Sequence, residues 1–188
     1  MKDVYIENNE YFYKNIKKYK KRNVYIHLLY DNKDITNDTF IEKRYDKDVK
    51  FKIYLIHASN IKDIKKRYSY IYDIVCNYLD QEFNNKNICG FDHNVCLSVK
   101  NNGHCKESKN GCCYGRNRGL CKNFKNGKCT IKSISCKLFI CRYLKKNKIR
   151  YRANDIPLLK YMFNIKQKFI IENSIFKDKE EIINLLLK

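Results

Sequence analysis

The sequence predicts an α+β protein in three regions: a small N-terminal strand and helix unit, an irregular cysteine- and glycine-rich metal-bound module, and a helical C-terminal tail. Three observations support this prediction. Runs of β-branched and aromatic residues near the start are typical of strands. A long segment after them repeats its apolar residues at helical spacing, and nine of the ten cysteines fall between residues 86 and 152. The expected boundaries are therefore residues 1–85, 86–152 and 153–188.

The N-terminal unit is expected to begin with short elements. Their composition predicts strand or helix as follows: Val4–Ile6 (strand), Glu10–Arg22 (basic helix), Val24–Tyr30 (buried strand) and Thr36–Tyr45 (short helix capped by Asp38). Val49–Leu55 then alternates apolar and polar residues, which is the pattern of a strand with one buried face.

A long amphipathic helix is predicted to follow and to end near Phe83. Its apolar residues recur every three or four positions, at Ile61, Ile64, Tyr68, Ile71, Tyr72, Val75 and Leu79. Ser59 or Asn60 is expected to cap its start. Cys76 lies beside the apolar face, and a lone cysteine on a helix usually serves as a small core residue. The polar residues 84–87 are expected to end the unit.

The tail, residues 153–188, is predicted to be helical and to pack on the N-terminal unit. Pro157 suits the first turn of a helix. Asp178 and Glu181 have the spacing of a capping box. The apolar residues that follow are too numerous for an isolated helix, so this end of the chain is expected to dock on the N-terminal unit.

The segment from Lys86 to Arg152 holds nine cysteines and all six glycines but few large apolar residues. Burial of so little hydrocarbon does not offset the entropy of ordering the backbone, so disulfides or a metal must hold the segment. The N-terminus shows no apolar signal segment or cleavage site. A reducing, cytoplasmic location is therefore expected, where structural disulfides are uncommon. Metal is favoured, and the even cysteine count keeps disulfides as the alternative.

Thiolates are soft ligands that suit Zn²⁺ at ~2.3 Å or an iron–sulfur cluster, and the sequence leaves both open. No Cys-x-x-Cys occurs, so the strongest signal for a zinc knuckle is missing. The adjacent Cys112 and Cys113 do not easily bind one tetrahedral ion, which indicates two centres or one bystander. His93 and His104 are candidate additional ligands. The predicted metal ligands are Cys89, Cys96, Cys105, Cys112, Cys113, Cys121, Cys129, Cys136 and Cys141.

The later cysteines follow a family pattern. After Cys105 come the pair Cys112-Cys113, the segment Cys121–Ile131 with Gly-Lys-Cys-Thr-Ile at its end, and Cys136–Arg142. This pattern resembles the zinc- or iron-chelating cysteine-cluster family, also called YkgJ-like, and related patterns occur in flagellin lysine N-methylases. The resemblance covers residues 105–142. It implies that the ligands are Cys105, Cys112, Cys113, Cys121, Cys129, Cys136 and Cys141.

The net charge of +20 is concentrated in the cysteine-rich segment. Residues 86–152 hold 17 Lys and Arg against two acidic residues, whereas residues 1–85 hold 17 against 13. Basic residues interleaved with tyrosines are able to follow a nucleic-acid backbone, so nucleic acid or another anionic partner is expected. A solvated surface is the alternative. The candidate nucleic-acid-binding residues are Arg116, Arg118, Lys145, Lys146, Lys148, Arg150 and Arg152.

The sequence shows no Ser/His/Asp set, P-loop, dinucleotide motif or paired carboxylates, so an enzyme would need its chemistry at the metal. A site closed by four thiolates catalyses nothing. The first hypothesis is therefore a cytoplasmic metal-binding protein whose cysteine-cluster module carries zinc or an iron–sulfur cluster. The alternatives are a nucleic-acid-binding protein that uses the basic module and, through the methylase resemblance, an iron–sulfur-dependent enzyme. No run of ~18 apolar residues occurs, so no membrane span is expected.

Overall fold

The computed structural model describes residues 1–20, 22–86, 91–92, 95–96, 124–125, 128–129, 133–139 and 142–188. Within these residues the fold is mixed α+β, with one three-stranded sheet and several helices. The predicted α+β class is therefore confirmed for the described residues.

The three-stranded sheet is built from β1 (Lys2–Glu7), β2 (Val24–Tyr30) and β3 (Lys33–Asp34), in that order. Helix α1 (Phe12–Tyr19) returns the chain between β1 and β2, so these two strands are parallel, and β3 pairs antiparallel with β2. Ile6 and Leu28 face each other in the register and are buried. The strands predicted in β1 and β2 and the helix between them are confirmed.

The strand predicted at Val49–Leu55 is wrong, because these residues belong to the helix α3 (Lys47–Asn60). Asp46 caps this helix by accepting the Val49 N–H at 2.9 Å. Helix α3 is buried on most of its circumference, and its buried residues are Val49, Phe51, Lys52, Ile53, Leu55, Ile56, Ala58 and Ser59. A helix buried on nearly all sides has no single apolar stripe, so its period is not visible in the sequence.

The short helix expected at Thr36–Tyr45 is confined to α2 (Ile41–Arg44). Asp38 does not cap it. Its carboxylate instead accepts the Phe40 N–H at 2.8 Å, in the turn that precedes the helix. Local turn hydrogen bonds of this kind compete with helix formation, which shortens the element.

The long helix is confirmed as α4 (Ile64–Lys86), but its expected cap is wrong. Asp63 accepts the Lys66 N–H at 2.8 Å at the start of the helix. Ser59 and Asn60 are instead the last residues of α3. The Asn60 amide bonds both the N–H and the carbonyl oxygen of Ile26, each at 2.8 Å, and so joins α3 to β2.

The second half of the described chain consists of two strand pairs and short helices. The elements are β4 (Phe91–Asp92), β5 (Val95–Cys96), β6 (Phe124–Lys125), β7 (Lys128–Cys129), α6 (Ile134–Leu138), α7 (Arg142–Lys146), η2 (Ala153–Asp155), α8 (Pro157–Met162), α9 (Ile165–Asn173) and α10 (Lys179–Leu186). Pro157 opens α8, and Asp178 and Glu181 form the capping box of α10, as predicted.

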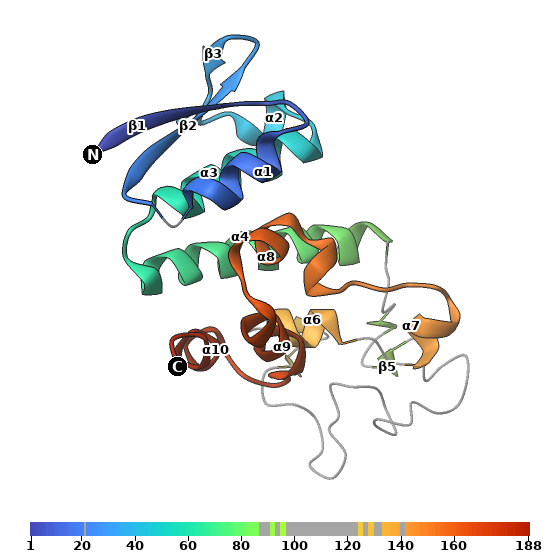
Figure 1. Cartoon of the computed structure of the whole chain (residues 1–188). Helices are drawn as coiled ribbons and strands as arrows, with labels where there is room; N and C mark the ends of the chain where they lie inside the picture. The colour runs from blue at the N-terminus through green and yellow to red at the C-terminus, as the bar shows by residue number, and fades with distance from the viewer. Residues whose placement is uncertain are drawn as a thin grey trace.

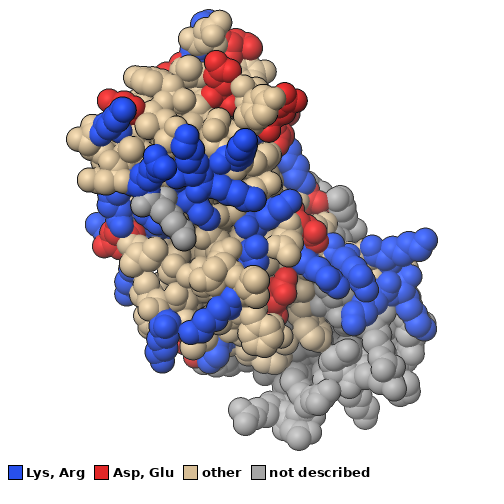
Figure 2. Space-filling view, in the orientation of Figure 1, with Lys and Arg blue, Asp and Glu red and all other residues tan. Residues whose placement is uncertain are grey.

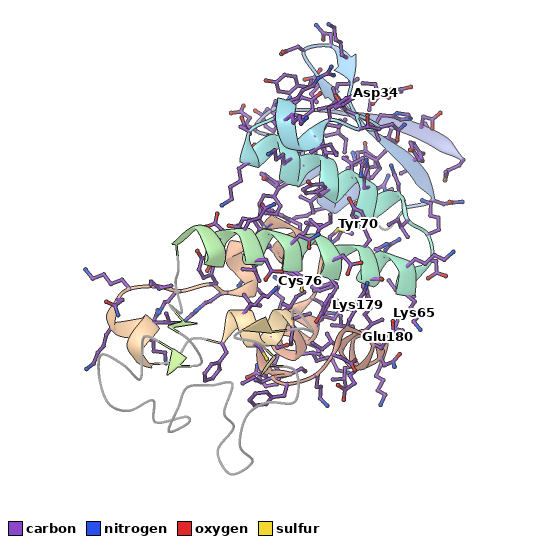
Figure 3. All side chains as sticks on the ribbon, turned by 180° about the vertical axis from the view of Figure 1, so that it is seen from behind. Asp34, Lys65, Tyr70, Cys76, Lys179 and Glu180 are labelled. Atoms are coloured by element: carbon purple, nitrogen blue, oxygen red, sulfur yellow. The ribbon has the colours of Figure 1, made fainter. Side chains whose placement is uncertain are left out.

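The helices stack in layers on one face of the sheet. Figure 1 shows α1 and α3 against the sheet, α4 and α8 below them, and α6, α9 and α10 farther down. On α4, Tyr70 lies on the side of α3 and bonds His57, whereas Cys76 lies on the side of α6 (Figure 3). A single core joins these layers, and it includes Ile134 of α6 and Ile183 of α10. The last part of the predicted cysteine module thus contributes to the main core.

Candidate functional site

The predicted metal ligands fall mostly outside the described residues. Cys136 is described with its side chain, and Cys96 and Cys129 are described as backbone positions in β5 and β7. The remaining predicted ligands lie outside the described residues: Cys89, Cys105, Cys112, Cys113, Cys121 and Cys141. Among the described side chains, no group of three or more His, Cys, Asp or Glu residues is close enough to hold a metal ion.

The two strand pairs place a cysteine at the same position. In the pair β4 and β5, Phe91 is opposite Cys96, and in the pair β6 and β7, Phe124 is opposite Cys129. Both pairs therefore follow the pattern Phe-x-x-x-x-Cys, an internal similarity that the sequence analysis missed. The Asn-Gly dipeptide at 126–127 is a strong hairpin signal and could have revealed the second pair.

Cys136 is held at the edge of the core by α6. Ile134 and Leu138 of this short helix are buried, and Cys136 between them is half-buried. The backbone N–H of Phe176, from the tail, donates to the Cys136 Sγ at 3.3 Å. Hydrogen bonds to a thiolate sulfur stabilise its charge, and metal ligands commonly receive such bonds from outer-shell groups. This geometry fits a metal-binding thiolate.

Cys76 has a different environment, which confirms its prediction as a core residue. It is 4% exposed, on the buried side of α4. Burial raises the pKa of its thiol to about 12, because the charged form would lose its hydration. A protonated, enclosed thiol is a poor ligand and a poor nucleophile. Among the described side chains, Cys76 and Cys136 are both free of disulfides.

A partly buried ion pair fixes α6 next to Cys76. Lys137 Nζ lies 2.5 Å from Asp80 Oδ1 and donates to the Cys76 carbonyl oxygen at 3.2 Å. The Ile134 N–H points at the Tyr72 hydroxyl oxygen at 3.4 Å. Burial is the largest cause that raises the pKa of Tyr72, so it stays a neutral phenol. These contacts set the position from which Cys136 is presented.

The histidines do not add to the described part of a metal site. His93 and His104 lie outside the described residues. His27 lies between two carboxylates, with Nδ1 at 2.6 Å from Asp34 and Nε2 at 3.5 Å from Asp3. His57 bonds Tyr70 at 3.2 Å and the Thr36 carbonyl oxygen. Both described histidines thus have structural partners within the N-terminal unit.

The predicted basic stretch after the cysteines is on the surface. Its five candidate residues are exposed, and none forms an ion pair with a described residue: Lys145, Lys146, Lys148, Arg150 and Arg152. Figure 2 shows a group of cations at the right-hand edge of the molecule, where α7 lies in Figure 1. Leu144 is buried and the Tyr151 hydroxyl donates to Glu82 at 3.2 Å, so both ends of the stretch are anchored. Arg116 and Arg118 lie outside the described residues.

A second group of cations gathers on the N-terminal unit, and the sequence analysis did not identify it. Lys20, Arg22, Asn23, Lys62 and Arg67 line an open pocket of about 350 Å³. Residues 1–85 hold 17 Lys and Arg against 13 acidic residues, and the sequence does not show which of these cations the fold brings together. Figure 2 shows a band of cations across the middle of this face, in the region of α1, with acidic groups at the top of the face.

Comparison with protein-family models, curated protein sequences and solved structures finds no match for this chain. The resemblance to the cysteine-cluster family over residues 105–142 therefore stays a prediction. Within the described residues, no helix has both the length and the apolar character needed to cross a membrane.

Proposed function

We propose that this chain is a metal-binding protein whose segment 86–152 binds zinc or an iron–sulfur cluster through cysteine thiolates. The proposal rests on the nine cysteines of this segment, which has too few apolar residues for a core of its own. In the structure, the proposal is supported by Cys136, a half-buried residue whose sulfur accepts the Phe176 N–H. When bound, the metal would supply the cross-links that order the segment.

The first test is the metal content of the full chain after anaerobic purification under reducing conditions. We expect stoichiometric metal. A colourless protein with bound zinc assigns a structural zinc site, and a brown protein with visible charge-transfer absorbance assigns an iron–sulfur cluster. A protein that retains neither metal, and whose thiols outside the core all react freely, would contradict the proposal.

Cys136 and Cys76 form a matched pair for the second test. We expect Cys136→Ser to lower the affinity for metal, measured by competition with a coloured chelator, because a thiolate ligand is lost. Cys76→Ala removes a thiol that is buried away from solvent, so its affinity for metal should equal that of the wild type. Equal affinities for both variants would remove Cys136 from the ligand set.

A second candidate function is nucleic-acid binding, and the exposed cations from Lys145 to Arg152 favour it. Such cations bind phosphates by releasing counterions, so the affinity should fall steeply with salt. The test is fluorescence anisotropy of a labelled single-stranded oligonucleotide at several salt concentrations, with the double variant Lys145→Glu, Lys146→Glu. No binding by the wild type at low salt would exclude this function.

A further inference from the structure

The pocket between the end of α1 and the turn that joins α3 to α4 collects cations from separate parts of the chain. Lys20 and Arg22 follow α1, and Lys62 and Arg67 come from the turn and from the first part of α4. Cations at the C-terminal end of a helix stabilise that helix, which accounts for the residues next to α1. Lys62 follows the C-terminal end of α3, and Arg67 donates to the carbonyl oxygen of Ile61, the C-cap of α3, so the pocket collects cations from the ends of two helices.

Backbone carbonyl groups, not carboxylates, hold two of these cations in place. Lys62 Nζ donates to the Val24 carbonyl oxygen at 2.8 Å. Arg67 donates to the Ile61 carbonyl oxygen through Nε at 2.8 Å and through Nη2 at 2.6 Å. A carbonyl group fixes the position of a cation and leaves its net charge in place.

The positive charge of the pocket is therefore not neutralised by a described acid. Arg22, Lys62 and Arg67 form no ion pair with any described residue. The nearest acid in sequence is Asp63, and its side chain accepts the Lys66 N–H at the start of α4. Three cations around an open pocket attract an anion with several oxygen atoms, such as a phosphate group.

Aromatic rings lie next to the pocket on the same surface. Lys18 and Arg22 lie over the Tyr19 ring, at 5.1 Å and 5.6 Å from its centroid. Tyr161 of α8 stacks on Tyr13 of α1, with centroids 4.5 Å apart, and Lys17 lies 5.3 Å from the Tyr161 ring. Cations alternating with half-buried tyrosines are the arrangement with which proteins bind single-stranded nucleic acid, since rings stack on bases and cations pair with phosphates.

We infer that the surface over α1, from Lys17 to Arg22, binds a single-stranded nucleic acid. One backbone phosphate would lie in the pocket formed by Arg22, Lys62 and Arg67. The inference rests on nucleic-acid binding, the second candidate function, but it uses a different surface. It requires neither the metal nor the residues after Lys145. The strand would follow the band of cations over α1 that Figure 2 shows.

The test compares double charge reversals in the full chain. The pocket variant is Arg22→Glu with Lys62→Glu, and the control is Lys33→Glu with Lys43→Glu, two exposed lysines of the same unit with the same change in charge. We measure the anisotropy of a labelled 20-nucleotide single strand, with far-ultraviolet circular dichroism and thermal unfolding to show that each variant is folded. If the Lys62→Glu change prevents folding, Arg22→Gln with Lys62→Gln replaces the pocket variant.

We expect the pocket variant to bind the oligonucleotide about tenfold or more weakly, with a smaller salt slope, and the control to change by less than about threefold. Equal losses in both variants would overturn the inference, because they would show only a general charge effect. Tighter binding of anionic phospholipid vesicles than of the oligonucleotide would also overturn it. If the Lys145 and Lys146 reversal weakens binding and the pocket reversal does not, the inference fails while nucleic-acid binding by the chain stands.

Discussion

Ile134→Ala tests whether α6, at the end of the cysteine-rich segment, is part of the main core. Ile134 is fully buried between α4 and the tail. The substitution deletes three carbon atoms, each of which contributes about 0.8 kcal/mol of transfer free energy. The cavity left behind adds to this loss, so we expect the free energy of unfolding to fall by about 2–5 kcal/mol.

The assay is urea unfolding of the metal-loaded protein followed by the circular dichroism of its helices. The control is Ile165→Ala in α9, where the isoleucine is 87% exposed, and its effect should stay within about 0.5 kcal/mol. A loss below about 1 kcal/mol for Ile134→Ala, with an unchanged urea dependence, would show that α6 does not belong to the cooperative core.

Three further predictions concern the N-terminal unit and its contact with the tail. Thr36→Val should lower the free energy of unfolding by about 1–3 kcal/mol in thermal melts, because the buried Thr36 hydroxyl oxygen accepts the Leu28 N–H at 2.8 Å and no other acceptor would replace it. Although burial acts to raise the pKa of Asp34, hydrogen bonds from Thr36 hold it below its ordinary value. The stability that Asp34 contributes is thus present above its unfolded-state pKa and lost as the pH falls through the folded-state pKa. The difference in free energy of unfolding between wild type and Asp34→Asn should therefore shrink on acidification. A difference that grows would contradict this. Lys179→Ala, which breaks an exposed ion pair with Asp73 at 2.7 Å (Figure 3), should cost less than about 1 kcal/mol, and a larger loss would show that this pair and not the apolar face docks α10.

The sequence predicted elements whose signals are local. The strand at 24–30, the long helix of α4 and the capping box of α10 each depend on residues close to one another in the chain, and all three are confirmed. The strand predicted at 49–55 failed because the burial of α3 depends on elements from distant parts of the chain. At residues 49–55, tertiary packing decided the structure and not the local alternation of apolar and polar residues.

The candidate site shows the same division between local and distant information. The cysteine spacing predicts thiol ligands from the sequence alone, and this stays a prediction. The cations of residues 145–152 were also identified from the sequence, and the structure places them on the surface. The pocket of Arg22, Lys62 and Arg67 could not be predicted from the sequence. These residues are up to 45 positions apart, and only the fold brings them together. Likewise, no sequence pattern indicates that a backbone N–H of the tail meets the Cys136 sulfur.

Amide hydrogen exchange before and after metal removal is the most direct test of the central claim that thiolate-bound metal orders the cysteine-rich segment, residues 86–152. The measurement uses the full chain, purified anaerobically and kept reduced, with and without a chelator. We expect exchange in this segment to become fast after chelation, whereas α3 and α4 keep their protection because their core is apolar. Unchanged exchange in the segment after complete removal of the metal would contradict the claim.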